Sequence, residues 1–122
     1  MIVTRPWGQY NLLEVEADYW IKTLTIRPNH RTSLQYHKNR EEIVFPLDAN
    51  AILNDGEKDI KLKPHFSQRI NSGKIHRYKA SGGDTVLAEL NCGESTDVIR
   101  IEDKYNREVV KEKVTKEKKR DV

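Results

Sequence analysis

The residues best suited to chemistry lie close together between positions 29 and 47. Gln35 and His37 are two residues apart, and Glu42 follows five residues later. Alternate side chains of an extended strand project from the same face, so Gln35 and His37 would point toward one place. Oxygen atoms of amides and carboxylates and imidazole nitrogens are ligands of divalent metals. Together with His76, in the segment NSGKIHRYK, these residues predict a metal site with four ligands.

The length and charge of the chain limit which kinds of protein it can be. A chain of 122 residues has room for one domain with one modest core. The formal net charge is +3, and much of the basic excess falls between positions 111 and 120. Because no basic stripe interleaved with aromatic residues occurs before that segment, nucleic-acid binding is not expected.

Cysteine content and hydropathy indicate the compartment. Cys92 is the single cysteine, so it has no internal disulfide partner and suits a reducing compartment. We expect it to be a small buried residue rather than a nucleophile. The first residues lack the apolar run of a signal peptide, and no stretch is long enough to cross a bilayer. We therefore expect a cytoplasmic protein without a membrane partner.

Most of the chain has the pattern of short strands separated by turns. Residues 9–15 and 18–27 predict two strands, and the second places Trp20, Leu24 and Ile26 on one face. The sequence Asn54-Asp55-Gly56 is typical of a hairpin turn. Further strands are expected at residues 58–63, 68–70, 76–79, 85–90 and 98–102. Turns at intervals of about eight to twelve residues indicate an all-β sandwich or barrel.

The last residues have a different composition. In residues 108–122, Glu and Lys are spaced for i,i+4 pairs, and Val109, Val110 and Val114 form a narrow apolar stripe. Such a segment is marginal as an isolated helix. We expect a folded domain at residues 1–107 and a charged tail, helical or disordered, at residues 108–122.

Four motifs in a fixed order carry a family resemblance. They are RPWG, SLQYHKNREE, SGKIHR, and GES followed by VIRIEDKYNR. Over residues 5–107 the chain resembles the cupin domain of type II mannose-6-phosphate isomerases. That domain often forms the C-terminal part of a bifunctional mannose-1-phosphate guanylyltransferase. The resemblance implies a cupin double-stranded β-helix, which is a jelly-roll barrel.

The two cupin motifs imply the same ligands as the strand spacing. Asn29 occupies the position of the first motif's glycine. The second motif maps onto Asn71, in place of its proline, Gly73 and His76. The implied metal ligands are Gln35, His37, Glu42 and His76. The cofactor would be one divalent metal ion, with zinc first and iron, manganese or nickel as alternatives.

The implied reaction converts an aldose phosphate into a ketose phosphate through an enediol. It needs a Lewis acid, a base and cations for the phosphate. Arg40 is the catalytic candidate, because the family also has arginine there and residue 40 shares a strand face with Glu42. Arg69 and Arg77 are further candidates for binding the phosphate, but both are expected instead to be surface arginines on edge strands. The closing motif, Arg100, Asp103, Tyr105 and Arg107, fits either a salt-bridged strand end or a substrate contact.

The sequence does not identify the catalytic base. Glu41 should point away from the face that carries Glu42, and the facing of Glu89 is ambiguous. His30 and His65 lie outside the ligand spacing and are expected to be exposed. Trp7 is expected to be a core or dimer-contact residue.

A second hypothesis belongs to a different class of protein. Lys38, Asn39, Ile43 and Val44 replace further histidines and a tryptophan of the family pattern. A non-catalytic cupin that binds a sugar or sugar nucleotide and partners a separate guanylyltransferase would fit these changes. Guanylyl transfer by this chain is not expected, because a Gly-rich phosphate loop is missing. The expected partners are a sugar phosphate and a second copy of the chain in a homodimer that includes the strand near Trp7.

Overall fold

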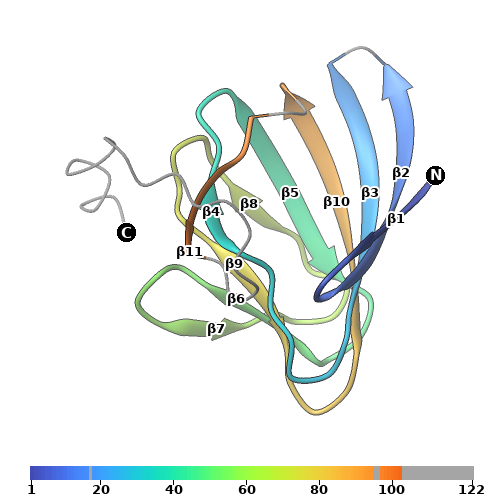
Figure 1. The fold of residues 1–122 in the computed structure, drawn as a ribbon, viewed down its shortest axis with the longest axis vertical. Helices are drawn as coiled ribbons and strands as arrows, with labels where there is room; N and C mark the ends of the chain where they lie inside the picture. The colour runs from blue at the N-terminus through green and yellow to red at the C-terminus, as the bar shows by residue number, and fades with distance from the viewer. Residues whose placement is uncertain (17, 95–96, 103–122) are drawn as a thin grey trace.

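The computed structural model describes residues 1–16, 18–94 and 97–102, and these residues form β-strands joined by turns (Figure 1). The all-β expectation is confirmed. No helix with the length and apolar character needed to span a membrane occurs in that part of the chain. The strands are β1 (Ile2–Arg5), β2 (Gly8–Glu16), β3 (Tyr19–Ile26), β4 (Leu34–Tyr36), β5 (Arg40–Pro46), β6 (Ala51–Asn54), β7 (Asp59–Lys61), β8 (Gln68–Ile70), β9 (Arg77–Ala80), β10 (Thr85–Gly93) and β11 (Ile99–Glu102).

The strands form one large sheet and two small ones. The large sheet has the order β1-β2-β3-β10-β5-β8, and the small sheets have the orders β7-β6-β9 and β11-β4. Figure 1 shows the small sheets facing the large one, so that the two layers enclose an interior. Isolated bridges between Gln35 and His76 and between Arg31 and Lys79 join the small sheets. The domain division at residue 107 and the expected tail lie outside the described residues.

Alternation along the strands fills the interior. Trp20, Leu24 and Ile26 are all buried on β3, as their spacing predicted. Trp7 is also buried within the core of its own chain, which confirms the core interpretation of this residue. The core cluster consists of Trp7, Leu24, Ile26, Val44, Ala51, Leu53, Leu62, Ile70, Tyr78, Ala80 and Leu87.

Two neighbouring strands divide the interior into an apolar end and a polar end. On β5 the buried positions change from Pro46 and Val44 to Glu42 and Arg40, and on β10 they change from Leu87 to Glu89 and Asn91. The antiparallel register places Glu42 opposite Asn91 and Val44 opposite Glu89. The polar ends of both strands therefore meet at the same end of the interior.

Two backbone positions, one at each end of the interior, restrict which residue types can occupy them. Gly93 is paired with Arg40. A Cβ on Gly93 would lie 2.1 Å from the carbonyl oxygen of Asn39, so only glycine permits this approach. Asn29, at the glycine position of the first cupin motif, has φ 64°, a left-handed conformation that asparagine tolerates.

The expectation that Cys92 is buried is wrong. Cys92 is exposed rather than buried. It lies on the outer face of β10, because its neighbour Asn91 occupies the inner face.

The predicted hairpin at Asn54 is confirmed by the pairing of β6 with β7.

Candidate metal centre and adjoining cavity

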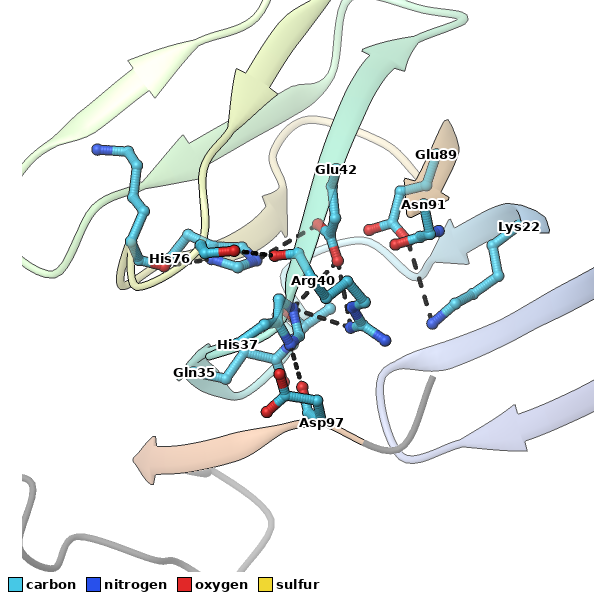
Figure 2. A network of polar contacts seen from close by, with 12 residues as sticks. Lys22, Gln35, His37, Arg40, Glu42, His76, Glu89, Asn91 and Asp97 are labelled. Carbon is cyan, nitrogen blue, oxygen red and sulfur yellow. Dashed lines mark hydrogen bonds and ion pairs between the residues drawn. The ribbon is translucent and has the colours of Figure 1, made fainter. Parts of the chain in front are cut away.

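Three of the four predicted ligands converge at the polar end of the interior. His37 follows β4, Glu42 lies on β5 and His76 immediately precedes β9, and all three are buried. One ligand atom from each lies within 4.8 Å of the others. Nε2 of His37 is 3.1 Å from Oε2 of Glu42, and Nε2 of His76 is 3.6 Å from Oε1. Figure 2 shows the two rings approaching the carboxylate from the β4 and β9 sides.

The second nitrogen of each ring fixes the tautomer. Nδ1 of His37 lies 2.6 Å from the carbonyl oxygen of Asp97, and Nδ1 of His76 lies 2.9 Å from that of Lys74. A carbonyl only accepts, so each Nδ1 carries the proton and each Nε2 presents a lone pair. Nε2 of His76 is buried and has no hydrogen-bond partner among the described residues. Two lone pairs directed at a carboxylate fit a cation, and histidine ligands of metals are commonly held by a backbone carbonyl in this way.

The protonation states of the cluster suit the same interpretation. Burial alone would raise the pKa of Glu42, but the neighbouring His37, His76 and Arg40 outweigh burial and hold that pKa well below its ordinary range. Burial lowers the pKa of His76 to about 4, against the opposing charge of Glu42. The cluster at neutral pH therefore contains an ionised carboxylate and a neutral His76, which are the forms that bind metals. The hydroxyl of Tyr78 donates to Oε1 of Glu42 at 3.3 Å.

The fourth predicted ligand, Gln35, is joined to the cluster through its backbone. Its N–H donates to the carbonyl oxygen of His76 at 3.0 Å, and it accepts from the N–H of His76 at 2.8 Å. Oε1 of Gln35 accepts a hydrogen bond from the hydroxyl of Ser33 at 2.8 Å. The Gln35 side chain lines the cavity beside the cluster.

Arg40 lies on the same face of β5 as Glu42, as the spacing predicted, and it is buried. Its Nη2 is 2.9 Å from Nε2 of His37 and 3.2 Å from Oε2 of Glu42. The guanidinium also lies over the ring of Trp20, 5.6 Å from its centroid. A carboxylate within the site, that of Glu42, is thus one partner of Arg40.

The two other arginines considered as phosphate ligands, Arg69 and Arg77, do not line the cavity that adjoins the cluster. Arg69 is exposed and pairs with exposed Glu41 at 3.0 Å, which confirms the expectation for both residues. The surface position expected for Arg77 is wrong, because this residue is buried and its Nε donates to the carbonyl oxygen of Thr32 at 3.1 Å. His65 is exposed, which confirms its expectation, but the exposed position expected for His30 is wrong, because His30 is half-buried.

A cavity of about 160 Å³ adjoins the cluster on the side of Arg40. Half-buried residues such as Arg5 and Val98 contribute to its wall, so the cavity reaches the surface. Its lining carries four basic residues and one carboxylate among the described residues. The lining consists of Arg5, Trp7, Tyr10, Lys22, Leu24, Thr32, Ser33, Gln35, Arg40, Tyr78, Glu89, Val98 and Arg100.

Glu89 is the carboxylate of this cavity, and it is buried. Nδ2 of Asn91 donates to its Oε1 at 3.3 Å, and Nζ of Lys22 lies 4.0 Å from the same oxygen. Burial and the charge of Glu42 raise the pKa of Glu89 to about 7, while Lys22 and Arg40 oppose the increase. In Figure 2 this group lies beside Glu42, toward Lys22.

Sequence reasoning missed Arg5 and Lys22 of the cavity wall, whereas Arg100 had been considered as a substrate contact. Arg5, Lys22 and Arg100 come from β1, β3 and β11, which are distant along the chain. Glu89 lies on a strand whose two faces both carry apolar residues. The alternation of polar and apolar residues therefore did not predict whether Glu89 points into the interior or outward. Glu42 and Glu89 therefore lie near one another in the interior because of the register between β5 and β10.

The chain matches known proteins at the level of sequence. The family model described as "Mannose-6-phosphate isomerase C-terminal" matches residues 1–103. The xanthan biosynthesis protein XanB of Xanthomonas campestris is 32% identical over 109 residues, which cover 86% of this chain and 23% of that protein. Mannose-1-phosphate guanylyltransferase ManC of Salmonella typhimurium is 33% identical over 111 residues, with the same coverage of both chains. The chain thus spans about a quarter of the length of these relatives.

Solved structures agree with the fold. The capsular polysaccharide assembling protein CapF of Staphylococcus aureus superposes with a TM-score of 0.70 at 11% identity, over 84% of this chain and 34% of that chain. A cupin superfamily protein of Desulfitobacterium hafniense superposes with a TM-score of 0.60 at 15% identity, over 70% of this chain and 76% of that chain. These similarities confirm the cupin double-stranded β-helix.

Proposed function

This chain belongs to the family of the mannose-6-phosphate isomerase C-terminal domain, and on that premise we propose that it is a metal-dependent sugar-phosphate isomerase. The reaction would interconvert an aldose phosphate such as mannose 6-phosphate and its ketose isomer. The observation that carries the proposal is the cavity with four basic side chains beside the His37–Glu42–His76 cluster. A phosphorylated substrate needs such cations, and a carbonyl that becomes an oxyanion needs an electrophile near them.

The proposed metal ligands are His37, Glu42 and His76, with Gln35 as the fourth. Zinc is the first candidate, since imidazole and carboxylate ligands suit it. When bound, the metal would supply Lewis-acid polarisation of the substrate carbonyl. The remaining work falls to side chains of this protein.

Arg40 would stabilise negative charge on the substrate. Its N–H and a metal ion compete for the same lone pair on Nε2 of His37. Arg40 would therefore give up that contact if His37 ligated a metal, and its N–H would become available to a substrate oxygen. A guanidinium in a buried position forms paired hydrogen bonds with phosphate or an oxyanion, which lysine does not reproduce.

Arg5, Lys22 and Arg100 would neutralise the phosphate at the other walls of the cavity. Arg5 and Lys22 both lie over the ring of Tyr10, at 5.3 Å and 4.6 Å from its centroid. The ring restricts the positions of both cations while leaving their N–H groups able to donate. These three residues replace Arg69 and Arg77 as candidates for the phosphate site.

A coupled isomerase assay with mannose 6-phosphate, with and without added divalent metal, tests the proposal. We expect turnover that depends on the metal. Absence of turnover in metal-loaded protein would contradict it.

The second candidate is a non-catalytic cupin that binds a sugar phosphate or sugar nucleotide and partners a separate guanylyltransferase. It is favoured by Lys38, Asn39, Ile43 and Val44, which replace further histidines and a tryptophan of the family pattern beside the predicted ligands. In that case the protein would bind the ligand without converting it. A homodimer and a cytoplasmic location belong to the same proposals, and the single cysteine supports the latter.

A further inference from the structure

The cavity contains one carboxylate among the described residues, and no role has yet been given to it. We propose that Glu89 is the base that carries the proton between the two carbons of the substrate, an inference that rests on the proposed isomerase function. Glu89 projects from β10 into the cavity, while Glu42 projects from neighbouring β5 into the metal cluster. The register offsets these two carboxylates by two residues along the strands, because Glu42 is opposite Asn91 and Glu89 is opposite Val44. A substrate carbonyl near Glu42 would therefore have its adjacent carbon on the side of Glu89 (Figure 2).

The partners of Glu89 can serve both of its protonation states. As a carboxylate it accepts from Nδ2 of Asn91 at 3.3 Å and lies near Lys22. Oδ1 of Asn91 is buried and has no hydrogen-bond partner among the described residues. If the side-chain amide of Asn91 rotates by half a turn, its Oδ1 accepts a hydrogen bond from a protonated Glu89. Asn91 is therefore a positioning residue that suits a group which gains and loses a proton in each cycle.

Electrostatics supports this assignment. The groups that act on Glu89 are Lys22 from β3, Arg40 and Glu42 from β5, Tyr78 from β9 and Asn91 from β10. Burial and Glu42 raise the pKa of Glu89 to about 7. A base with a pKa near the working pH is ionised often enough to take a proton and basic enough to hold it.

The proton transfer balances without any other reagent. The Glu89 carboxylate takes the proton from C2 of the open-chain aldose phosphate, and the electrons of that C–H bond form the C1=C2 bond. The C1 carbonyl oxygen receives the π electrons, and its negative charge faces Arg40. A proton then passes from the C2 hydroxyl to the C1 oxygen. Glu89 returns its proton to C1, the C1=C2 electrons form the new C–H bond, and C2 becomes the ketone.

Glu89→Gln tests the assignment, because glutamine keeps the size and the contact with Asn91 but takes no proton. In metal-loaded protein we expect kcat to fall at least about 100-fold, the scale of losing a general base. KM and metal content should change by no more than a few-fold. Deuterium transfer from heavy water into the carbon-bound positions of the substrate should be lost. The matched control is Glu41→Gln on the outer face of the adjacent strand, which should keep wild-type kinetics.

Two failures are distinguishable in this experiment. Wild-type protein that shows no turnover would overturn the isomerase function and the role of Glu89 together. Active wild-type protein with an active, exchange-competent Glu89→Gln variant would overturn the role of Glu89 alone.

A second variant covers the case in which Glu89→Gln does not fold. Lys22→Met removes a half-buried cation that lowers the pKa of Glu89. The acidic limb of the kcat against pH profile should therefore move to higher pH in this variant. An unmoved limb would contradict the assignment, even if KM rises through the loss of a phosphate contact.

Discussion

Glu42 and Glu89 project from adjacent strands into one interior, and their surroundings drive their pKa values in opposite directions. Two imidazoles and Arg40 hold the pKa of Glu42 well below its ordinary range. Burial, with the charge of Glu42 itself, raises the pKa of Glu89 to about 7. Separated pKa values in a pair of buried carboxyl groups commonly mark different chemical roles. Here the ionised partner suits cation binding, and the other suits proton transfer.

The first prediction concerns metal content. Protein purified without chelator should contain roughly one divalent ion per chain by elemental analysis. His76→Ala should lose most of it, because removal of one ligand leaves an incomplete site. His65→Asn is the matched control, since His65 is exposed and asparagine tolerates its φ of 68°. Full metal occupancy in His76→Ala would refute the ligand assignment.

The second prediction concerns Arg40. Arg40→Lys keeps the charge but loses the planar fork, so the paired contacts with His37, Glu42 and substrate are not all retained. We expect kcat/KM to fall by roughly tenfold or more, the scale of one charge-assisted hydrogen bond of about 1.5 to 3 kcal/mol. Steady-state kinetics of metal-loaded protein would measure it. Arg69→Lys, at an exposed pair, should behave like the wild type, and equal kinetics in the two variants would count against the role of Arg40.

The third prediction concerns stability against pH. The folded-state pKa of Glu89, about 7, lies above its ordinary value of 4.5. The favourable contribution of this group is therefore complete below about pH 4.5 and is lost as pH rises through 7, because the folded protein must then ionise a buried carboxyl. The loss is on the order of 3 kcal/mol.

Glu89→Gln removes this loss. Its free energy of unfolding relative to the wild type should therefore increase between pH 5 and pH 8, as measured by urea denaturation. Glu41→Gln, at an exposed ion pair, should show no such trend. A constant difference between Glu89→Gln and wild type across this pH range would show that Glu89 titrates normally.

The fourth prediction concerns assembly. We expect a homodimer at micromolar concentration in sedimentation experiments. Trp7 is enclosed in the core of its own chain, so the N-terminal strand would contribute exposed Ile2 to the contact instead. Ile2→Lys should then increase the monomer fraction, and Phe66→Lys, at another exposed apolar residue, should not. A wild-type monomer would contradict the expected dimer.

The sequence by itself determined most of the strands, though not β1, and the positions of the candidate ligands. Alternation placed Trp20, Leu24 and Ile26 on one face of β3, and Asn54-Asp55-Gly56 marked the hairpin between β6 and β7. These signals are local, because a strand repeats every two residues and a tight turn selects its residue types. The same period placed Arg40 beside Glu42 and directed Glu41 outward.

Only the tertiary structure decided which residues surround the site. The cations of the cavity come from strands far apart in the chain, and their meeting depends on the closure of the sheets. The facing of Glu89 and the exposure of Cys92 depend on the register of β10, since apolar residues occur on both faces of that strand. The burial of Arg77 depends on a hydrogen bond to Thr32, 45 residues away. Local patterns carry no information on such contacts, because distant segments meet only when the interior forms.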